Sequence, residues 1–528
     1  MSVLKITDFS GGLNTRFRQN FIADNQTPQC RNIRFRRQGG LSKRFGSSLI
    51  SVTAAAASTG SSFGCHAYAL SGMSAEAMVV FTQESPAAVY KTTDGTTFSN
   101  VTGAYNTGES IDLTTKNDLI HFLTFKDSVY AFANYADTRS YDNTTWSRIA
   151  TANNVFPKSK LGVVHKNRIF SGYVTYGGTT YKSRIKWSDY AANVWTTTNF
   201  EDIFADDGTV LIGMCSYGDE LIIWKGPENA SQSWMHAKMF RVLGDNFDAS
   251  VQQYAIQQIP MPPGVGLLGP DGWAIHEGRL IFLTNEGFYE YIGGGSAPQD
   301  ISDLIREDMN ELSVSTFNEW DSKPSAFSFD GRFYCTLRST LNSSEGYVNI
   351  TYILEEKAWS TDILSSTADS FALGSGHGVQ YTKFLGNFYC APATTATFSG
   401  LLTGSLRRIE IENQFQENIG NDSTAYVNAS VKTKEFDLGK ETFVRSIFIY
   451  LRRQSSGTLT FGYNLDQRGE TTTSVDMTAG DTGTTESSSS TVLKKEIWIG
   501  QICRTIQFRF HDLSNNDFEI YGLEVDYK

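Results

Sequence analysis

The sequence has few of the features that are typical of membrane proteins, secreted proteins or proteins stabilised by a structural metal. Its six cysteines lie far apart and form no Cys-x-x-Cys pair, so neither a zinc site nor a disulfide framework is indicated. No apolar run approaches the roughly 18 residues of a transmembrane helix, so no membrane span is expected. The first residues lack the apolar core of a secretory signal. Helical periodicity is nearly absent, because short alternating segments lie between Gly, Asn, Asp and Ser clusters, and an all-β fold is therefore expected.

Charge is distributed unevenly along the 528 residues, although the net charge is only −11. Residues 1–50 contain nine basic and two acidic side chains, whereas the rest of the chain contains 36 basic and 54 acidic ones. This asymmetry indicates a basic terminal segment attached to an acidic body.

A short hairpin pattern recurs through the middle of the chain. Each copy has a turn residue followed by an apolar strand, and the copies begin at Asp127, Asn167, Asp219, Gly278, Gly331 and Gly386, with a looser one at Glu76. Some copies are followed by a polar turn and a Trp-Ser/Thr pair, at Trp146, Trp195 and Trp359. The interval of about fifty residues is typical of a four-stranded propeller blade. A stack of β-sandwich domains is the alternative, but it predicts no sustained period.

The pattern divides the chain into three parts. Residues 1–60 are predicted to form an extended basic arm, residues 61–415 a β-propeller of about six to seven blades, and residues 416–528 a C-terminal β-sandwich. In the last part the period is lost, and Ile506, Phe508 and Phe510 alternate with polar residues as in a strand buried on one face. A single helix is expected over residues 300–312.

No catalytic constellation is evident. Residues 264–269 have the spacing of a dinucleotide-binding loop, but the flanking prolines favour an ordinary loop. The acidic run over residues 201–208 lacks the alternation of a calcium loop and is interpreted as a solvated turn. We therefore expect no enzyme, no cofactor and no metal, although a glycosidase needs only two carboxylates brought together from different blades.

The N-terminal arm contains the candidate interface. Its Phe and Arg residues are interleaved, so the aromatic rings can fill pockets while the guanidinium groups bind acidic partners. The alternative is an edge strand with a solvated basic face. The predicted assembly-interface residues are Phe9, Arg16, Phe17, Arg18, Phe21, Arg34, Phe35, Arg36, Arg37, Lys43 and Arg44.

The same arm resembles a known family. The segments Asp8–Asn14, Ala23–Pro28, Arg31–Ile33 and Gly40–Gly46 are similar to the start of tail nozzle proteins of short-tailed bacteriophages, also called packaged-DNA stabilisation or tail tube B proteins. The closing region from Val431 to Val525 is similar to their end. The resemblance covers both ends of the chain, and the propeller pattern in the middle agrees with it.

This resemblance implies a structural virion protein, made in the cytoplasm of the bacterial host and placed in the virion tail. It implies a homo-oligomeric ring, usually a hexamer, that hangs below the portal and adaptor proteins and carries tail fibres or spikes. Double-stranded DNA would pass through the ring without sequence-specific binding. Two other functions stay open: a host-adsorption propeller that binds or cleaves surface glycans, and a tail-fibre adaptor without a channel. In the first, aromatic residues such as Trp187, Trp195 or Trp234 would stack on sugars if exposed, although core packing is the favoured interpretation of these tryptophans.

Overall fold

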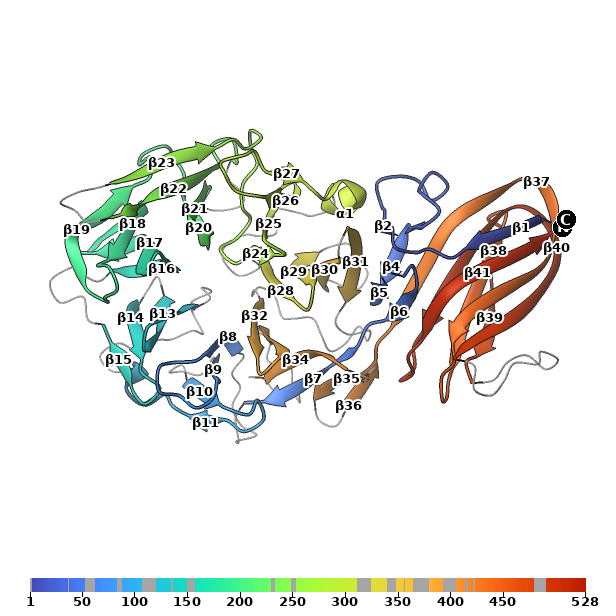
Figure 1. The fold of residues 1–528 in the computed structure, drawn as a ribbon, viewed down its shortest axis with the longest axis horizontal. Coiled ribbons are helices and arrows are strands. Elements are labelled where there is room, and N and C mark those ends of the chain that lie inside the picture. Colours follow the sequence, from blue (N-terminus) through green and yellow to red (C-terminus); the bar gives the residue numbers. More distant parts are fainter. Residues whose placement is uncertain are drawn as a thin grey trace.

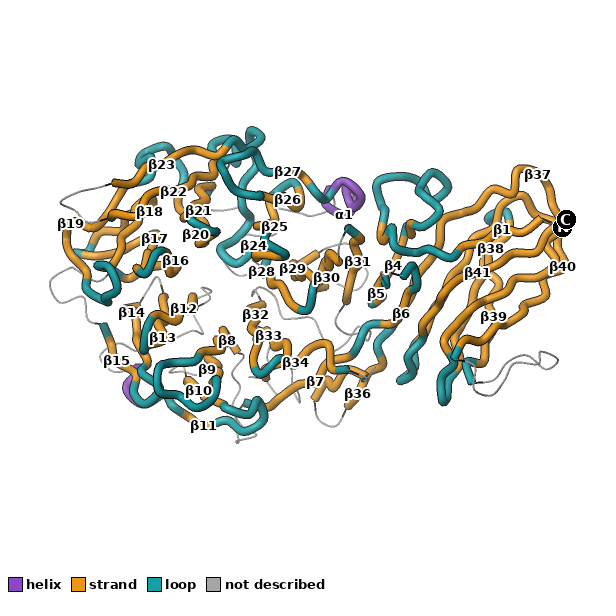
Figure 2. Tube along the Cα trace, in the orientation of Figure 1, coloured by secondary structure: helices purple, strands orange, loops and turns teal. Residues whose placement is uncertain are grey.

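The fold is built almost wholly of β-strands. The computed structural model describes residues 2–36, 38–52, 62–82, 88–106, 120–133, 136–149, 157–228, 233–247, 253–310, 324–339, 348–355, 357–363, 379–392, 405–412, 414, 416–420, 423–478 and 491–528. Figure 2 shows these residues mostly as strands and connecting loops, with few helical turns. Within them, no helix is long and apolar enough to cross a membrane.

Six four-stranded antiparallel sheets and the first four strands of a six-stranded sheet stand side by side as seven blades in a ring, which confirms an all-β fold with a propeller of six to seven blades (Figure 1). Blade 1 consists of β8 (Ser62–Tyr68), β9 (Ala77–Thr82), β10 (Ala88–Thr92) and β11 (Ser99–Asn100), and blade 2 of β12 (His121–Phe125), β13 (Ser128–Ala133), β14 (Ala136–Tyr141) and β15 (Trp146–Arg148). Blade 3 consists of β16 (Lys158–His165), β17 (Arg168–Tyr176), β18 (Thr179–Ser188) and β19 (Trp195–Asp202). Blade 4 consists of β20 (Val210–Tyr217), β21 (Glu220–Gly226), β22 (Lys238–Asn246) and β23 (Gln253–Ile259). A short 3-10 turn, η1 (Gly103–Asn106), lies between blades 1 and 2.

The remaining blades have the same layout. Blade 5 consists of β24 (Trp273–His276), β25 (Arg279–Thr284), β26 (Gly287–Tyr291) and β27 (Gln299–Asp300). Blade 6 consists of β28 (Ser325–Phe329), β29 (Arg332–Ser339), β30 (Val348–Glu355) and β31 (Ala358–Ile363). Blade 7 consists of β32 (Val379–Phe384), β33 (Asn387–Pro392), β34 (Ser405–Ile411) and β7 (Gly46–Ser51). The helix expected over 300–312 is shorter in the described residues, where it consists of η3 (Asp303–Ile305) and α1 (Arg306–Asn310).

The predicted hairpins join the first two strands of the blades. In four of them, both residues of the two-residue turn have positive φ angles: Lys166 and Asn167, Glu277 and Gly278, Asp330 and Gly331, and Leu385 and Gly386. Such angles match the twist of a tight hairpin, which is why these positions favour Gly and Asn. The three repeated tryptophans, Trp146, Trp195 and Trp359, lie on the fourth strands and are buried.

The seventh blade is completed by a strand from the start of the chain. β7 pairs antiparallel with β34, with Ile50 opposite Leu406, and so provides the fourth strand. The first strands of blades 7 and 1 then meet, because the backbone N–H groups of Cys65 and Ala67 donate to Gln380 (3.0 Å) and Thr382 (3.2 Å). Part of the predicted arm of residues 1–60 therefore belongs to the propeller and closes its ring. Beyond β7 the sheet continues into β35 (Gln416–Gly420) and β36 (Ser423–Tyr426).

The C-terminal part is a sandwich made from two long, bent strands and shorter ones. β37 (Ala429–Arg452) and β40 (Val492–Asp512) pair along their whole length, with register shifts near residues 437–442 where the sheet folds over. One half pairs with β4 (Gln29–Arg31) and with β38 (Thr458–Leu465), which in turn pairs with β39 (Glu470–Asp476). The other half pairs with β41 (Glu519–Tyr527), which in turn pairs with β1 (Ser2–Ile6) and β6 (Leu41–Lys43). β5 (Ile33–Phe35) pairs with β6.

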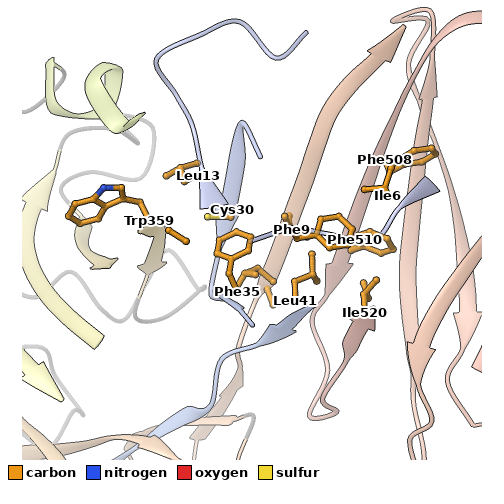
Figure 3. Packing of buried hydrophobic residues seen from close by; sticks show 14 of the residues in the cluster. Ile6, Phe9, Leu13, Cys30, Phe35, Leu41, Trp359, Phe508, Phe510 and Ile520 are labelled. Atoms are coloured by element: carbon orange, nitrogen blue, oxygen red, sulfur yellow. The ribbon is translucent and has the colours of Figure 1, made fainter. Parts of the chain in front are cut away.

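One hydrophobic cluster extends from the sandwich into blades 5 and 6, and the N-terminal segment lies between them. Figure 3 shows Leu13 and Cys30 facing Trp359 of blade 6, whereas Phe9 and Leu41 face Phe510 of the sandwich. The segment thus contributes apolar side chains to both neighbours. Buried apolar area stabilises such contacts by about 25 cal/mol per Å².

Candidate functional site

The N-terminal segment over residues 8–46, which carries the candidate interface residues, lies in a joint between blade 6 and the sandwich (Figure 1). The segment first comes close to blade 6 in β2 (Gly12–Leu13), which pairs with β3 (Gln26–Thr27). Gly12 has φ +66°, and a Cβ there would lie 2.9 Å from the Cβ of Ala358 and from the backbone of Trp359. The glycine therefore permits both the left-handed turn and the close contact with blade 6.

A buried charge cluster fixes the same segment to the propeller. The guanidinium of Arg34 donates two hydrogen bonds to Asp362 (2.8 and 2.5 Å) and contacts Glu410. Arg44 donates to the side chain of Asn32 (2.8 Å), and its Nε lies 3.7 Å from Asp362. Burial disfavours the charge of Arg34, but the two carboxylates raise its pKa well above the usual value. This cluster therefore connects the N-terminal segment to the propeller within one chain.

A second buried ion pair binds the segment to the sandwich. Lys43 donates to Asp512 (2.5 Å) and to the carbonyl oxygen of Ser514 (2.6 Å). Burial lowers the pKa of Lys43, and Asp512 partly offsets that effect. Because Arg34, Arg44 and Lys43 all bind acidic or polar groups of their own chain, their charges stabilise the joint.

The predicted interface residues therefore fall into two groups. The buried ones are Phe9, Arg34, Phe35, Lys43 and Arg44, and they belong to the joint; the exposed ones are Arg16, Phe17, Arg18, Phe21 and Arg36. Arg37 lies outside the described residues. Intramolecular contacts thus account for the first group, and only the second group has surface available for a partner.

Four of the exposed residues lie in one loop, residues 14–25, which connects β2 with β3 and is called the aromatic loop below. Phe17 is 48% exposed and Phe21 73% exposed, and the guanidinium of Arg16 lies 4.9 Å from the Phe17 ring. Arg16 also pairs with Asp303 beside α1. The loop presents two large apolar rings next to a basic side chain, Arg18.

The acidic run over residues 201–208 encloses a lysine ammonium group. Lys225 donates to the carbonyl oxygens of Ile203 and Phe204 (both 2.7 Å) and to Asp207 (2.9 Å), and Lys238 donates to the other oxygen of Asp207 (3.1 Å). The oxygens that a calcium ion would need thus already bind an internal cation. In the part of the chain that is described, no group of three or more His, Cys, Asp or Glu side chains could hold a metal ion.

Residues 264–269 form a loop, as the flanking prolines predicted. β24 and not a helix follows it, and Val265, Leu267 and Leu268 are buried. Without a helix N-terminus after the glycines, the loop has no phosphate-binding geometry.

Three histidines connect neighbouring blades near the propeller axis. The rings of His66, His165 and His276 lie on the first strands of blades 1, 3 and 5 and hydrogen-bond to Thr124 (2.8 Å), Ser216 (2.8 Å) and Ser328 (3.1 Å) on the first strands of the next blades. Burial lowers the pKa of all three, to about 4 for His66 and His165. These imidazoles are neutral at pH 7 and belong to the blade contacts.

Side chains from opposite blades also meet across the axis. Nε2 of His121, at the start of blade 2, lies 3.9 Å from Oδ1 of Asp271, which is two residues before β24 of blade 5. At this level the axis of a single propeller leaves no room for duplex DNA. Any DNA channel would therefore have to lie between several copies of the chain.

The tryptophans considered for sugar stacking are not surface platforms. Trp187 and Trp195 are buried and Trp234 is half-buried, whereas Trp498 on β40 of the sandwich is 63% exposed. The guanidinium of Arg445 lies 5.8 Å from the Trp498 ring, and Phe443 and Ile502 are exposed cross-strand partners nearby. The alternation of apolar and charged residues over 493–499 indicates that Trp498 is exposed, because Trp498 lies on the same face of the strand as Lys494 and Glu496.

Comparisons with known proteins identify no family. No family model matches, and a search of curated proteins finds no relative. Solved structures show only remote likeness. An exo-β-1,3-galactanase from Phanerochaete chrysosporium, solved with galactose, has 10% identity and a TM-score of 0.27 over 90% of this chain and 100% of its own. PorZ, a surface component of the type-IX secretion system of Porphyromonas gingivalis, has 10% identity and a TM-score of 0.35 over 74% of this chain and 44% of its own.

A further structure, described only as a glycoside hydrolase, has 9% identity and a TM-score of 0.25 over 89% of this chain and 99% of its own. The expectation that the chain is not an enzyme is corrected by these findings, because several of the structures found are glycoside hydrolases. At such TM-scores the likeness itself assigns no catalytic residue and no substrate.

Proposed function

We propose that the chain is a subunit of a homo-oligomeric ring in the tail of a short-tailed bacteriophage, a nozzle through which DNA passes. The observation that carries this proposal is the separation of charge. Residues 53–426, which contain all of the propeller except β7, have 24 basic and 40 acidic side chains, and three of the nine basic residues within residues 1–50 are neutralised inside the joint. Proteins that grip DNA need many free Lys and Arg, since each phosphate contact adds salt-sensitive affinity. An acidic body instead lets DNA slide.

Two further observations support a ring. The axis of one propeller is crossed by His121 and Asp271, so a conduit requires several copies. The segments that resemble the nozzle family form the joint between propeller and sandwich, which explains physically why Gly12 and the basic residues occur there. Portal, adaptor and fibre proteins are the partners that this proposal implies.

Electron microscopy tests the ring directly. The purified chain is imaged alone and after mixing with a portal–adaptor complex, and its DNA affinity is measured at about 0.15 M salt, where nonspecific contacts are partly screened. We expect closed rings with a bore that admits duplex DNA and no measurable DNA affinity. Absence of rings in both samples, or tight salt-sensitive DNA binding, contradicts the proposal.

A second function, saccharide recognition, is favoured by Trp498. An exposed indole offers a flat apolar surface to a sugar ring, and Arg445 with its neighbour Asp526 (3.8 Å) supplies polar groups beside it. Under this proposal the sandwich, and not the propeller, holds the sugar.

A glycan array separates this function from the first. Trp498→Ala should weaken binding by about tenfold or more, whereas Tyr190→Ala, which removes an aromatic ring of the same 63% exposure from blade 3, should have no effect. Any glycan that binds is also assayed for release of reducing ends, which distinguishes cleavage from binding. Equal binding by both variants contradicts a Trp498 site.

A further inference from the structure

The aromatic loop is held firmly although its two phenylalanines face solvent. On the propeller side, the backbone N–H groups of Thr15 and Arg16 donate to the carbonyl oxygen of Leu304 (2.8 and 3.2 Å). On the sandwich side, the carbonyl oxygen of Gln19 accepts from the N–H of Glu435 (3.1 Å), and its side chain accepts from Gln507 (3.0 Å).

The end of the loop is anchored as well. Asp24 pairs with Lys434 (2.6 Å), Ile22 is buried, and Gln26 accepts hydrogen bonds from Asn14 (2.7 Å) and Ala23 (3.0 Å). A loop fixed at both ends loses little conformational entropy when it binds, so its exposed rings can act as preorganised anchors. Large aromatic residues together with arginine are the side chains that most often dominate binding energy at protein interfaces.

Blade 4, which blade 5 separates from blade 6, has an edge with complementary chemistry. Blade 4 exposes Phe204 (56%) and Met235 (71%), and Asp206 is exposed in the same turn as Phe204. Lys238, three residues after Met235, binds Asp207 of that turn, so the two segments lie at the same edge of the blade. Asp207 is paired with Lys225 and Lys238, and Lys238 lies 5.7 Å from the Phe204 ring, so the edge is apolar and carries the exposed carboxylate of Asp206. The aromatic loop is apolar and carries the exposed Arg18.

These two surfaces cannot meet within one chain. The aromatic loop lies between blade 6 and the sandwich, and blade 5 separates blade 6 from blade 4 in the ring (Figure 1). A ring of identical copies requires a heterologous interface, in which one surface of a chain binds a different surface of the next. Both surfaces occur among the residues that the structure describes.

We infer that the aromatic loop, through Phe17, Phe21 and Arg18, docks on the Phe204–Met235 edge of blade 4 of a second copy of this chain. This inference rests on the ring proposed above and names the contact that forms it. The occupant is a second copy because Arg18 of the loop complements the exposed carboxylate of Asp206 on that edge, and because residues 53–426, with 24 basic and 40 acidic side chains, are acidic as a whole.

The full-length chain allows a direct test. Assembly is followed by analytical ultracentrifugation for wild type, for the double variant Phe17→Ser/Phe21→Ser and for Arg18→Glu. Leu385→Ser is the matched control, since Leu385 is 47% exposed in a turn of blade 7 that the interface does not use. Each loop variant should raise the concentration for half-assembly by about tenfold or more, and the control should not change it. Unfolding temperatures confirm that all variants fold.

Photo-crosslinking identifies the acceptor surface. Phe21 is replaced by p-benzoylphenylalanine, and crosslinked peptides should come from residues 200–240 of another copy. Crosslinks to the sandwich, or assembly of the double variant at wild-type concentrations, overturn the inference while leaving the ring intact. A wild-type chain that forms no ring overturns the ring proposal and this inference together.

Discussion

Arg34 and Asp362 are separated by 328 positions in the chain and form a buried ion pair with two parallel hydrogen bonds of 2.8 and 2.5 Å. The same guanidinium contacts Glu410, so one cation faces two carboxylates in the joint between propeller and N-terminal segment. An arginine that the sequence suggests for an external acidic partner thus has its acidic partners inside the fold.

Replacing Arg34 by Met should strongly destabilise the protein. The substitution leaves the carboxylate of Glu410 buried without its cation and leaves Asp362 with only the more distant Arg44 (3.7 Å), and such a loss costs about 3–5 kcal/mol. Arg34→Lys should have an intermediate effect, because lysine keeps the charge but not the planar pair of donors. Urea unfolding, followed by tryptophan fluorescence, measures the free energies.

The control for Arg34→Met is Arg18→Met, which removes an exposed arginine from the same segment. Surface substitutions of this kind change stability by about 0.5 kcal/mol or less. Equal unfolding free energies for the two variants would mean that the buried pair does not hold the joint.

Calcium should have no effect on the stability of the acidic turn near blade 4. The oxygens of Ile203, Phe204 and Asp207 already accept hydrogen bonds from Lys225. We expect the same unfolding temperature in calcium and in EDTA, measured by calorimetry. A rise of several degrees on addition of calcium would show that the ion competes with the ammonium group.

Lys225→Met should lower the free energy of unfolding by about 2–4 kcal/mol, because it leaves Asp207 and two carbonyl groups without their buried donor. Lys238→Met is the matched control, since Lys238 binds the same carboxylate but is about a quarter exposed. Its cost should be clearly smaller.

The propeller could be predicted from the sequence because its signal is local and repeated. Each hairpin combines a turn that tolerates positive φ with two apolar strands, as at Glu277 and Gly278, and these features lie within about fifteen residues. Repetition at about fifty residues then indicates the ring.

The position of the N-terminal segment in the fold, and the partners of its basic residues, could not be predicted in the same way. The basic residues of the joint bind groups more than 300 positions away, and composition cannot distinguish a partner in the same chain from a partner in another. Burial decides this question, and burial follows from the tertiary arrangement. The strand that completes blade 7 was missed for the same reason, since β7 belongs by sequence to the arm but by pairing to β34.

Trp498 shows that a local signal can also be overlooked. The alternation of buried Leu493 and Ile499 with exposed Glu496 places the indole on the solvent side of β40. The propeller tryptophans considered for sugar stacking, such as Trp187, instead pack in the core.

Acid should weaken the contacts between blades. Burial lowers the pKa of His66 and His165 to about 4, and the second cause is the neighbouring charge of His121 or Lys166. In the unfolded chain these imidazoles take up protons near pH 6.5, so the unfolded state binds more protons between pH 6.5 and 4. The free energy of unfolding should therefore fall by a few kcal/mol as the pH drops through this window.

His165→Gln isolates one contribution to this effect. The variant keeps a polar group near Ser216 but cannot titrate, so its stability should vary less between pH 7 and 4 than that of wild type, as measured by urea unfolding at each pH. His236→Gln, which removes an exposed histidine, is the matched control. Parallel curves for wild type and His165→Gln would exclude a role for His165.

Asp517 should have the opposite dependence on pH. One of its carboxyl oxygens is buried without a hydrogen-bond partner among the described residues, and burial, with the neighbouring charge of Glu519, raises the pKa of Asp517 to about 6. A folded pKa above the unfolded one means that the acid stabilises the fold when it is protonated, and that this contribution is lost as the pH rises through about 6. At pH 8 the fold must therefore hold an unfavourable buried charge.

Asp517→Asn replaces the acid by a neutral side chain of the same shape. The variant should be more stable than wild type at pH 8 by about 1–3 kcal/mol, and the difference should vanish below about pH 4, where wild-type Asp517 is itself neutral. Asp437→Asn, which removes an exposed carboxylate paired with Arg504, should give no gain at pH 8. Urea unfolding of the three proteins at both pH values decides the matter. A gain for Asp517→Asn that is equal at pH 4 and pH 8 would show that packing, and not the buried charge, causes it.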